Sequence, residues 1–106
     1  MEHGDLQVLV DRTTEQSVVR LTGELDLSTV DRFSDVVHGE LGRSPGRIVV
    51  DLAGLTFCDS IGLGTLIVLS RTAANQQTYL QLRNPSPFFS RMLDVTGVRR
   101  GLNITP

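Results

Sequence analysis

The chain has 106 residues, of which 40% are hydrophobic, and this suits one domain over residues 1–106 with a single core. Its 10 basic and 12 acidic side chains leave a formal net charge of -2, which excludes a strongly basic surface for direct binding of nucleic acid. No stretch approaches the roughly 20 apolar residues of a membrane span, and the N-terminus lacks a secretion signal. We therefore expect a cytoplasmic protein that does not insert into membranes.

The first half of the chain predicts a hairpin followed by a helix. Residues 6–11 and 17–22 are rich in β-branched residues and are separated by a polar stretch. In the second run apolar and mixed positions alternate, which predicts a sheet with one face open to solvent. Residues 28–31 have the form of a capping box, so we expect a helix to begin at Ser28. The expected buried stripe of this helix is Val30, Phe33, Val36, Val37 and Leu41, with Asp31, Arg32, Asp35 and Glu40 facing water.

The stretch over residues 47–69 predicts a central strand, a connector and a buried helix. Ile48, Val49, Val50 and Leu52 form a continuous apolar run, as in strands that are covered on both faces. Residues 65–69 are too apolar for a surface helix. Because backbone polar groups in a loop need water, residues 58–64 should lie at the surface, with the Ser60 hydroxyl at the helix N-terminus.

The last third of the chain predicts a strand, a helix and a short final strand. Residues 78–83 alternate as a half-buried strand does, and residues 102–105 can supply a last strand. Ser86 followed by Pro87 predicts a helix start, and Gly97 predicts its end. The order β-β-α-β-α-β-α-β indicates an α/β fold with a mixed, mostly parallel sheet and an N-terminal antiparallel hairpin.

Residues 58–64 could hold several kinds of site, and the sequence disfavours three of them. Gly62 and Gly64 open a helix after a strand, but Ile67 stands where a dinucleotide fingerprint has its third glycine. A hydrolase nucleophile at Ser60 would have glycine two residues before it, where this chain has Cys58. The single cysteine and the dispersed carboxylates and histidines show no metal-ligand spacing. We therefore expect no catalytic residue, no metal and no cofactor.

Two structural alternatives stay open on the residues alone. Asp59 or Ser60 could be an ordinary N-cap, since either side chain can accept a hydrogen bond from the following turn. Cys58 could be a buried hydrophobe, or a thiol whose pKa is lowered by the nearby helix N-terminus.

Several motifs occur in the order found in one family. They are LTGELD at residues 21–26 before a predicted helix, Asp51-Leu52, FCDSIGLG at residues 57–64, and Asn84-Pro85-Ser86 with residues 93–97. Over residues 5–100 the chain resembles the STAS domain family, and within it the stand-alone anti-sigma factor antagonists. The resemblance implies a single-domain STAS-like fold.

The resemblance also implies a function as a switch and not as an enzyme. Ser60 would accept a phosphate from a partner that is both anti-sigma factor and serine kinase, and a serine phosphatase would remove it. The unmodified form would bind the anti-sigma factor and release the sigma factor. The implied partner-binding residues are Asp26, Ser28, Asp59, Ile61, Gly62 and Leu63.

Two other functions fit the same motifs. The chain could be the small STAS subunit of a lipid-transport ABC complex, where it would act as an adaptor on an ATPase. It could also be a redox-responsive antagonist that uses Cys58.

Overall fold

The computed structural model describes residues 5–105. Residues 1–4 include most of the N-terminus on which the expectation about secretion rests, and they lie outside the described residues. The elements are β1 (Leu6–Arg12), β2 (Gln16–Leu25), α1 (Val30–Leu41), β3 (Arg47–Cys58), α2 (Ser60–Asn75), β4 (Tyr79–Arg83), α3 (Pro87–Thr96), a 3-10 turn η1 (Val98–Gly101) and β5 (Asn103–Thr105). Apart from η1, this is the predicted order.

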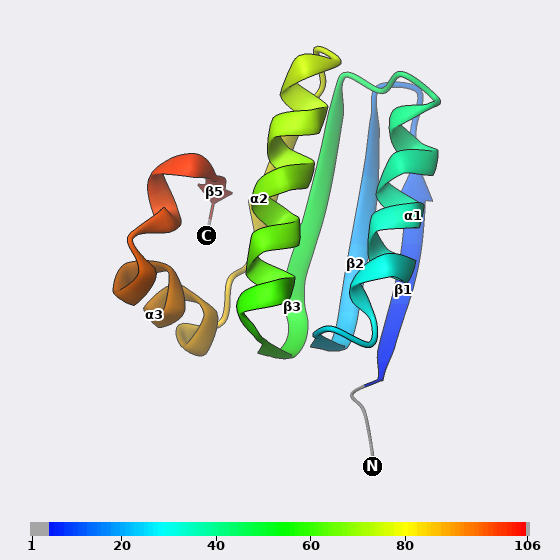
Figure 1. Ribbon diagram of the computed structural model, residues 1–106. Helices are drawn as coiled ribbons and strands as arrows, with labels where there is room; N and C mark the ends of the chain where they lie inside the picture. Colours follow the sequence, from blue (N-terminus) through cyan, green and yellow to red (C-terminus); the bar gives the residue numbers. More distant parts are fainter. Residues whose placement is uncertain (1–4, 106) are drawn as a thin grey trace.

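The five strands form one sheet in the order β1-β2-β3-β4-β5. β1 pairs with β2 in antiparallel orientation, and every later pair is parallel, as predicted. α1 and α2 lie side by side over one face of the sheet, and α3 lies beyond α2 toward the side of the sheet where β5 lies (Figure 1). The predicted open face is therefore confirmed for β1, β2 and β3. The expectation that β3 is covered by other elements on both faces is wrong, since of its apolar run only Ile48, Val50 and Leu52 face the helices and the core.

One hydrophobic core lies between the sheet and the helices. Strand residues that alternate toward the helices supply one side of it, and the apolar stripes of the helices supply the other. Its largest fully buried side chains include Phe33, Phe89, Leu21, Leu25, Ile48, Leu52, Leu66, Leu69, Leu80, Leu82 and Leu93.

The predicted capping box at Ser28 is wrong. α1 begins at Val30, and its N-cap, Thr29, makes no side-chain capping bond. The Ser28 hydroxyl instead donates to Asp26 Oδ1 at 2.7 Å, and the Ser28 N–H donates to the same oxygen at 2.9 Å. Asp26 therefore closes its own turn at the end of β2, and this local competition draws Ser28 away from the helix.

The prediction that Glu40 faces water is also wrong. Its residue is only 3% exposed, and its carboxylate accepts hydrogen bonds from Arg12 Nη2 at 2.8 Å and from Ser17 Oγ at 2.7 Å. The hydrogen bonds from Arg12 lower the pKa of Glu40 against the opposing effect of burial, and Ser17 and the charges of Arg12 and Arg43 add to the lowering. Glu40 thus fastens α1 to the first hairpin.

We expect Glu40→Gln to lower the free energy of unfolding by about 2 kcal/mol, because charge-assisted hydrogen bonds to Arg12 and Ser17 are lost. Since the folded-state pKa lies below the ordinary value of 4.5, this stabilisation is present above pH 4.5 and is lost as the pH falls through the folded-state pKa. Urea unfolding between neutral pH and pH 3 measures it. Asp35→Asn on the exposed side of the same helix is the control, and an equal loss in both variants would contradict the assignment.

The central strand and helix differ from their predicted extents. β3 continues to Cys58 and α2 begins at Ser60, so the connector between them is Asp59 alone. The strand extends because β2 runs beside it as far as the pair Leu25 and Cys58. α2 is not buried all round, since Val68 is 59% exposed.

The predicted ends of α3 are confirmed. Ser86 Oγ accepts a hydrogen bond from the Phe89 N–H at 3.1 Å, with Pro87 in the first turn. Gly97 ends the helix in the left-handed region at φ 73°. A residue with a Cβ adopts this φ only with strain, so glycine suits this end.

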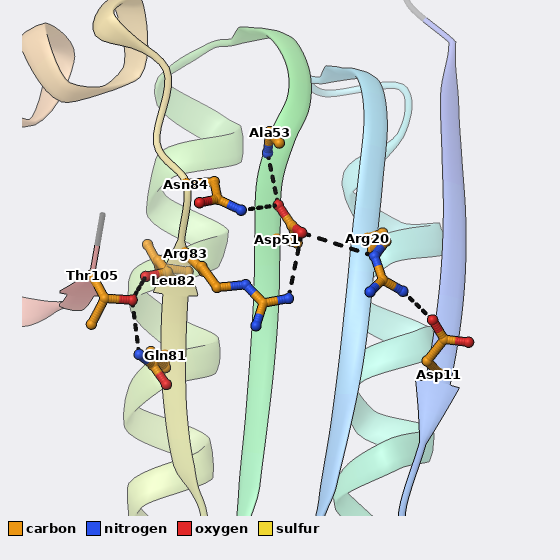
Figure 2. A network of polar contacts seen from close by, with 9 residues as sticks. All are labelled: Asp11, Arg20, Asp51, Ala53, Gln81, Leu82, Arg83, Asn84 and Thr105. Carbon is orange, nitrogen blue, oxygen red and sulfur yellow. Dashed lines mark hydrogen bonds and ion pairs between the residues drawn. The ribbon is translucent and has the colours of Figure 1, made fainter.

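A network of polar side chains lies on the open face of the sheet and includes Asp11, Arg20, Asp51, Arg83 and Asn84 (Figure 2). Asp51 accepts hydrogen bonds from the Ala53 N–H at 3.0 Å and from Asn84 Nδ2 at 3.2 Å. Burial raises the pKa of Asp51, but these hydrogen bonds and the Arg83 charge outweigh it and lower the pKa overall. Asp51 and Asn84 each belong to one of the motifs that carry the family resemblance, and their hydrogen bond joins β3 to the end of β4.

Candidate functional site

Two loops that are far apart in sequence meet at the carboxyl ends of β2 and β3. β2 and β3 are parallel neighbours, and Leu25 is paired with Cys58 at their ends. The Asp59 N–H donates to the Leu25 carbonyl oxygen at 3.2 Å, which ties the start of α2 to the end of β2. The loop from Asp26 to Thr29 and the residues around Ser60 therefore form one surface at the carboxyl ends of β2 and β3.

Asp59 caps α2, and Ser60 is left for another role. Asp59 Oδ1 accepts a hydrogen bond from the Gly62 N–H at 2.8 Å, so of the two candidates the capping residue is Asp59. Ser60 is the first residue of α2 and is exposed, and no group among residues 5–105 forms a hydrogen bond with its hydroxyl. An unbonded serine oxygen at a helix N-terminus faces the positive end of the helix dipole, where a negative group is stabilised.

Gly62 and Leu63 are buried, so the expectation that residues 58–64 lie at the surface is wrong for these two residues, as it is for Cys58. A Cβ at Gly62 would lie 2.6 Å from the Leu25 carbonyl oxygen and 2.9 Å from Cys58 Sγ, so only glycine lets α2 approach β2 this closely. The Leu63 residue is 5% exposed and belongs to the core. Neither presents a side chain to a partner, whereas Ile61 does, at 45% exposure.

Asp26 and Ser28 stand on the neighbouring loop. The Ser28 N–H and hydroxyl both bond to Asp26 Oδ1, and Thr29 Oγ1 donates to the Glu24 carbonyl oxygen at 2.9 Å. These contacts hold the loop in one shape, with Ser28 at the surface. The structure therefore brings five of the predicted site residues together at the carboxyl ends of β2 and β3, namely Asp26, Ser28, Asp59, Ser60 and Ile61.

Sequence reasoning missed three exposed apolar residues beside these loops. Leu27, between Asp26 and Ser28, is 70% exposed. Phe57, just before the Cys58-Asp59 pair, stacks on Phe88 with ring centroids 6.4 Å apart, and both rings are partly exposed. An apolar residue inside a polar loop was the available signal for Leu27, but the stacking of Phe57 on Phe88 depends on the tertiary fold.

A groove of about 370 Å³ runs between α1 and α2 from this surface. It is lined by Val30, Asp31, Ser34, His38, Ile61, Gly64, Thr65, Val68 and Leu69. Apart from the adjoining residues and the nearby backbone of α2 itself, no atom of the described residues lies within 4 Å of a Cβ placed at Gly64. The missing side chain of Gly64 therefore widens the groove and does not serve close packing. Of the two glycines in the first turns of α2, Gly62 therefore permits close packing and Gly64 does not.

Cys58 is a buried hydrophobe and not an activated thiol. Its residue is 2% exposed, and burial, with a further contribution from the Asp59 charge, raises its pKa to about 12. The thiol is therefore protonated near neutral pH, and the protonated form is a poor nucleophile. This contradicts the alternative of a lowered pKa and removes the basis for a redox switch.

We expect Cys58 to resist thiol reagents in the folded protein. At pH 8 a pKa of about 12 leaves about one thiol in ten thousand ionised, and burial excludes the reagent from the rest. Labelling with a disulfide reagent at pH 8, with and without denaturant, measures this. Labelling that is equally fast in both conditions would contradict the burial of Cys58.

Two further features of the described residues bear on the site. No group of three or more histidine, cysteine, aspartate or glutamate residues within residues 5–105 is arranged to hold a metal ion. None of the helices in the same range has the length and apolar character needed to cross a membrane.

Comparison with known proteins identifies the family of this fold. The family model described as "Mlab, STAS domain" matches residues 8–105. A STAS-domain containing protein of Pseudomonas aeruginosa is 26% identical over 91 residues, which cover 86% of this chain and 89% of that protein. An anti-sigma F factor antagonist of Paenibacillus polymyxa is 29% identical over 99 residues, which cover 89% of this chain and 81% of that protein.

The crystal structure of an anti-sigma factor antagonist from Mycobacterium paratuberculosis has the same fold. Its TM-score is 0.86 at 24% sequence identity, and the match covers 96% of this chain and 86% of that chain. The predicted STAS-like fold is thus confirmed. Because the family model spans almost all of residues 5–105 and the sheet has the expected order, the chain belongs to the STAS domain family.

Proposed function

We propose that this chain is an anti-sigma factor antagonist switched by phosphorylation of Ser60. In the unmodified form it binds an anti-sigma factor that is also a serine kinase, and the sigma factor is released. The kinase phosphorylates Ser60, the complex dissociates, and a serine phosphatase restores the binding form. The protein itself carries out no catalysis in this cycle.

The exposed hydroxyl of Ser60 is the observation that carries the proposal. It stands at the first turn of α2, where Asp59 already caps the helix and leaves the serine oxygen without a bond among the described residues. A kinase can therefore reach the oxygen without unfolding the helix. The similarity to proteins named anti-sigma factor antagonists supports the same partner class.

The surface around Ser60 suits a protein partner. Ile61 and Leu27 supply exposed apolar area, and Asp26, Ser28 and Asp59 supply polar groups beside it. Protein interfaces combine such an apolar centre with a polar rim. Gly62 and Leu63 contribute by holding α2 against β2, not by direct contact.

A phosphate on Ser60 would act through charge. It adds about -1.5 to -2 charges at neutral pH. At about 5 Å from one partner carboxylate, with an effective dielectric constant near 20, each unit of charge costs about 3 kcal/mol. Because about 1.4 kcal/mol is a factor of ten in affinity, this repulsion weakens the complex at least about a hundredfold. The fold stays intact because the modified oxygen is already at the surface.

Kinase assays on matched serine variants test the acceptor. The wild type, Ser60→Ala and Ser44→Ala are incubated with an anti-sigma factor kinase and ATP, and intact mass is recorded. Ser44 is an exposed serine at the opposite end of β3 and serves as the control. We expect phosphate on the wild type and on Ser44→Ala only. Equal incorporation into Ser60→Ala would remove Ser60 from its assigned role.

A second candidate is the adaptor subunit of a lipid-transport ABC complex. The matching family model is described as "Mlab, STAS domain", a description that does not name an anti-sigma factor antagonist. In that case the same surface would dock on an ATPase. Co-purification from the native cell distinguishes the two functions, since it recovers a sigma-regulating kinase in one case and an ABC ATPase in the other.

A further inference from the structure

β1 is an unprotected edge strand. Within residues 5–105 it pairs on one side only, with β2, and Figure 1 shows no element beyond it on the other side. Its seven residues, LQVLVDR, include no proline or lysine, and its pairing with β2 has no bulge. Proline, charged side chains and bulges are among the usual means by which proteins keep an edge strand from pairing with another chain. The two charged residues of β1, Asp11 and Arg12, lie at its C-terminal end and are paired with Arg20 and Glu40.

The hydrogen-bonding groups that face away from β2 can be identified from the ladder. The Glu24 N–H donates to the Asp5 carbonyl oxygen at 2.9 Å, and the Thr13 N–H donates to the Gln16 carbonyl oxygen at 2.8 Å. Backbone groups alternate along a strand, so the odd-numbered residues of β1 bond to β2. The N–H and C=O groups of Leu6, Val8, Val10 and Arg12 therefore point outward along the edge.

The sequence of β1 is complementary to itself about Leu9. In an antiparallel pair of two copies centred there, Val8 lies opposite Val10 and Leu6 opposite Arg12, all with outward-facing backbone groups. Leu9, which is 53% exposed on the open face, meets Leu9 of the second copy. Gln7 meets Asp11, so an amide faces a carboxylate and no like charges are opposed.

Other registers fit less well. A pair centred on Val8 would place Asp5 opposite Asp11, which is a repulsion between like charges. A pair centred on Val10 would leave Leu6 and Gln7 outside the ladder. The register centred on Leu9 is the one that uses the whole of β1.

A hollow beside the edge can receive the second strand. It has a volume of about 750 Å³ and lies against β1 and the outer side of α1, with Leu6, Val8, Leu9, Arg32 and Val36 among its lining residues. Val8, Val10 and Val36 are only partly buried against the core. A partner strand would cover them and continue the sheet.

We propose that two copies of this chain associate through antiparallel pairing of β1 centred on Leu9, which joins their sheets into one. The surface at Ser60 lies at the ends of β2 and β3 and stays available to a partner in each copy. The inference does not depend on the role of Ser60.

Cysteine cross-linking tests both the pairing and its register. In a non-hydrogen-bonded antiparallel pair the Cα atoms are about 4.5 Å apart, which a disulfide can span. We expect Leu9→Cys to form a disulfide-linked dimer rapidly under mild oxidation. Gln7→Cys is the matched control, because its two cysteines would be four residues apart along the strands, about 13 Å. Buried Cys58 does not compete. Equal rates for Leu9→Cys and Gln7→Cys would overturn the register.

Sedimentation equilibrium tests the association without a cross-link. We expect the mass of the wild type to rise from 11.6 kDa toward twice that value with concentration. Leu9→Lys, which opposes two positive charges across the axis, should weaken the association at least tenfold. Val95→Lys adds the same charge at an exposed position on α3 and should have no effect. A wild type that stays monomeric at millimolar concentration would overturn the proposal.

Discussion

Ser60→Glu is expected to weaken binding of the anti-sigma factor by about a hundredfold. Ser60→Gln should weaken it far less, because glutamine has the size of glutamate but no charge. The difference isolates charge, because both side chains occupy the same space at the exposed first turn of α2. One negative charge at about 5 Å from a partner carboxylate costs about 3 kcal/mol at an effective dielectric constant near 20. Isothermal titration calorimetry at physiological salt measures the two dissociation constants.

The salt dependence of this difference is a second measurement in the same experiment. Repulsion between charges weakens as the Debye length falls from about 8 Å at 0.15 M salt to about 3 Å at 1 M. The gap between Ser60→Glu and Ser60→Gln should therefore narrow at high salt. Equal affinities of the two variants at low salt would show that size, not charge, governs docking at Ser60.

Gly62→Ala and Gly64→Ala are expected to change stability in opposite directions although both add one methyl group to α2. At Gly62 the new Cβ would lie 2.6 Å from the Leu25 carbonyl oxygen, so α2 must move away from β2. Overpacking of this kind costs about 1–3 kcal/mol, and a backbone atom yields less than a side chain. At Gly64 the new Cβ would have no atom of the described residues within 4 Å beyond the adjoining residues and the nearby backbone of α2. The better helix propensity of alanine should therefore stabilise the protein by about 0.5–1 kcal/mol.

Thermal and urea unfolding of the two variants measure these changes. Amide NMR shifts show where the structure moves, and for Gly62→Ala we expect shifts at Leu25, Cys58 and Asp59. Because Asp59 and Ser60 would move with the start of α2, this variant should also bind the partner more weakly. A stabilised Gly62→Ala would contradict the close approach of α2 to β2.

Local patterns in the sequence were enough for the order of the elements. Alternation of apolar residues along a strand and their three-to-four spacing along a helix depend on neighbours in the chain, so they can be recognised without the fold. The end signals at Ser86 and Gly97 worked for the same reason, since a cap is made within one turn. The predicted start of α1 was wrong because the Asp26 carboxylate accepts the hydrogen bonds of Ser28, which lies only two residues away.

The candidate site was only partly accessible to the same reasoning. Ser60 and Asp59 stand in a motif that the sequence shows, and the exposed position of Ser60 agrees with the expectation. Which of the two caps the helix could not be decided locally, because both side chains can reach the first turn. The burial of Leu63 and the raised pKa of Cys58 follow from what packs against them, which the sequence does not state.

By itself the sequence determined the element order, the α/β class and the residues of the motif that carries Ser60. Only the tertiary structure decided that Glu40 is buried against Arg12 and Ser17, that Gly62 touches β2 while Gly64 opens a groove, and that β1 has a free edge. The physical reason is the distance along the chain between the residues that interact. Helix and strand patterns act between residues a few positions apart, whereas Arg12 and Glu40 are 28 positions apart and meet only when the chain closes around its core.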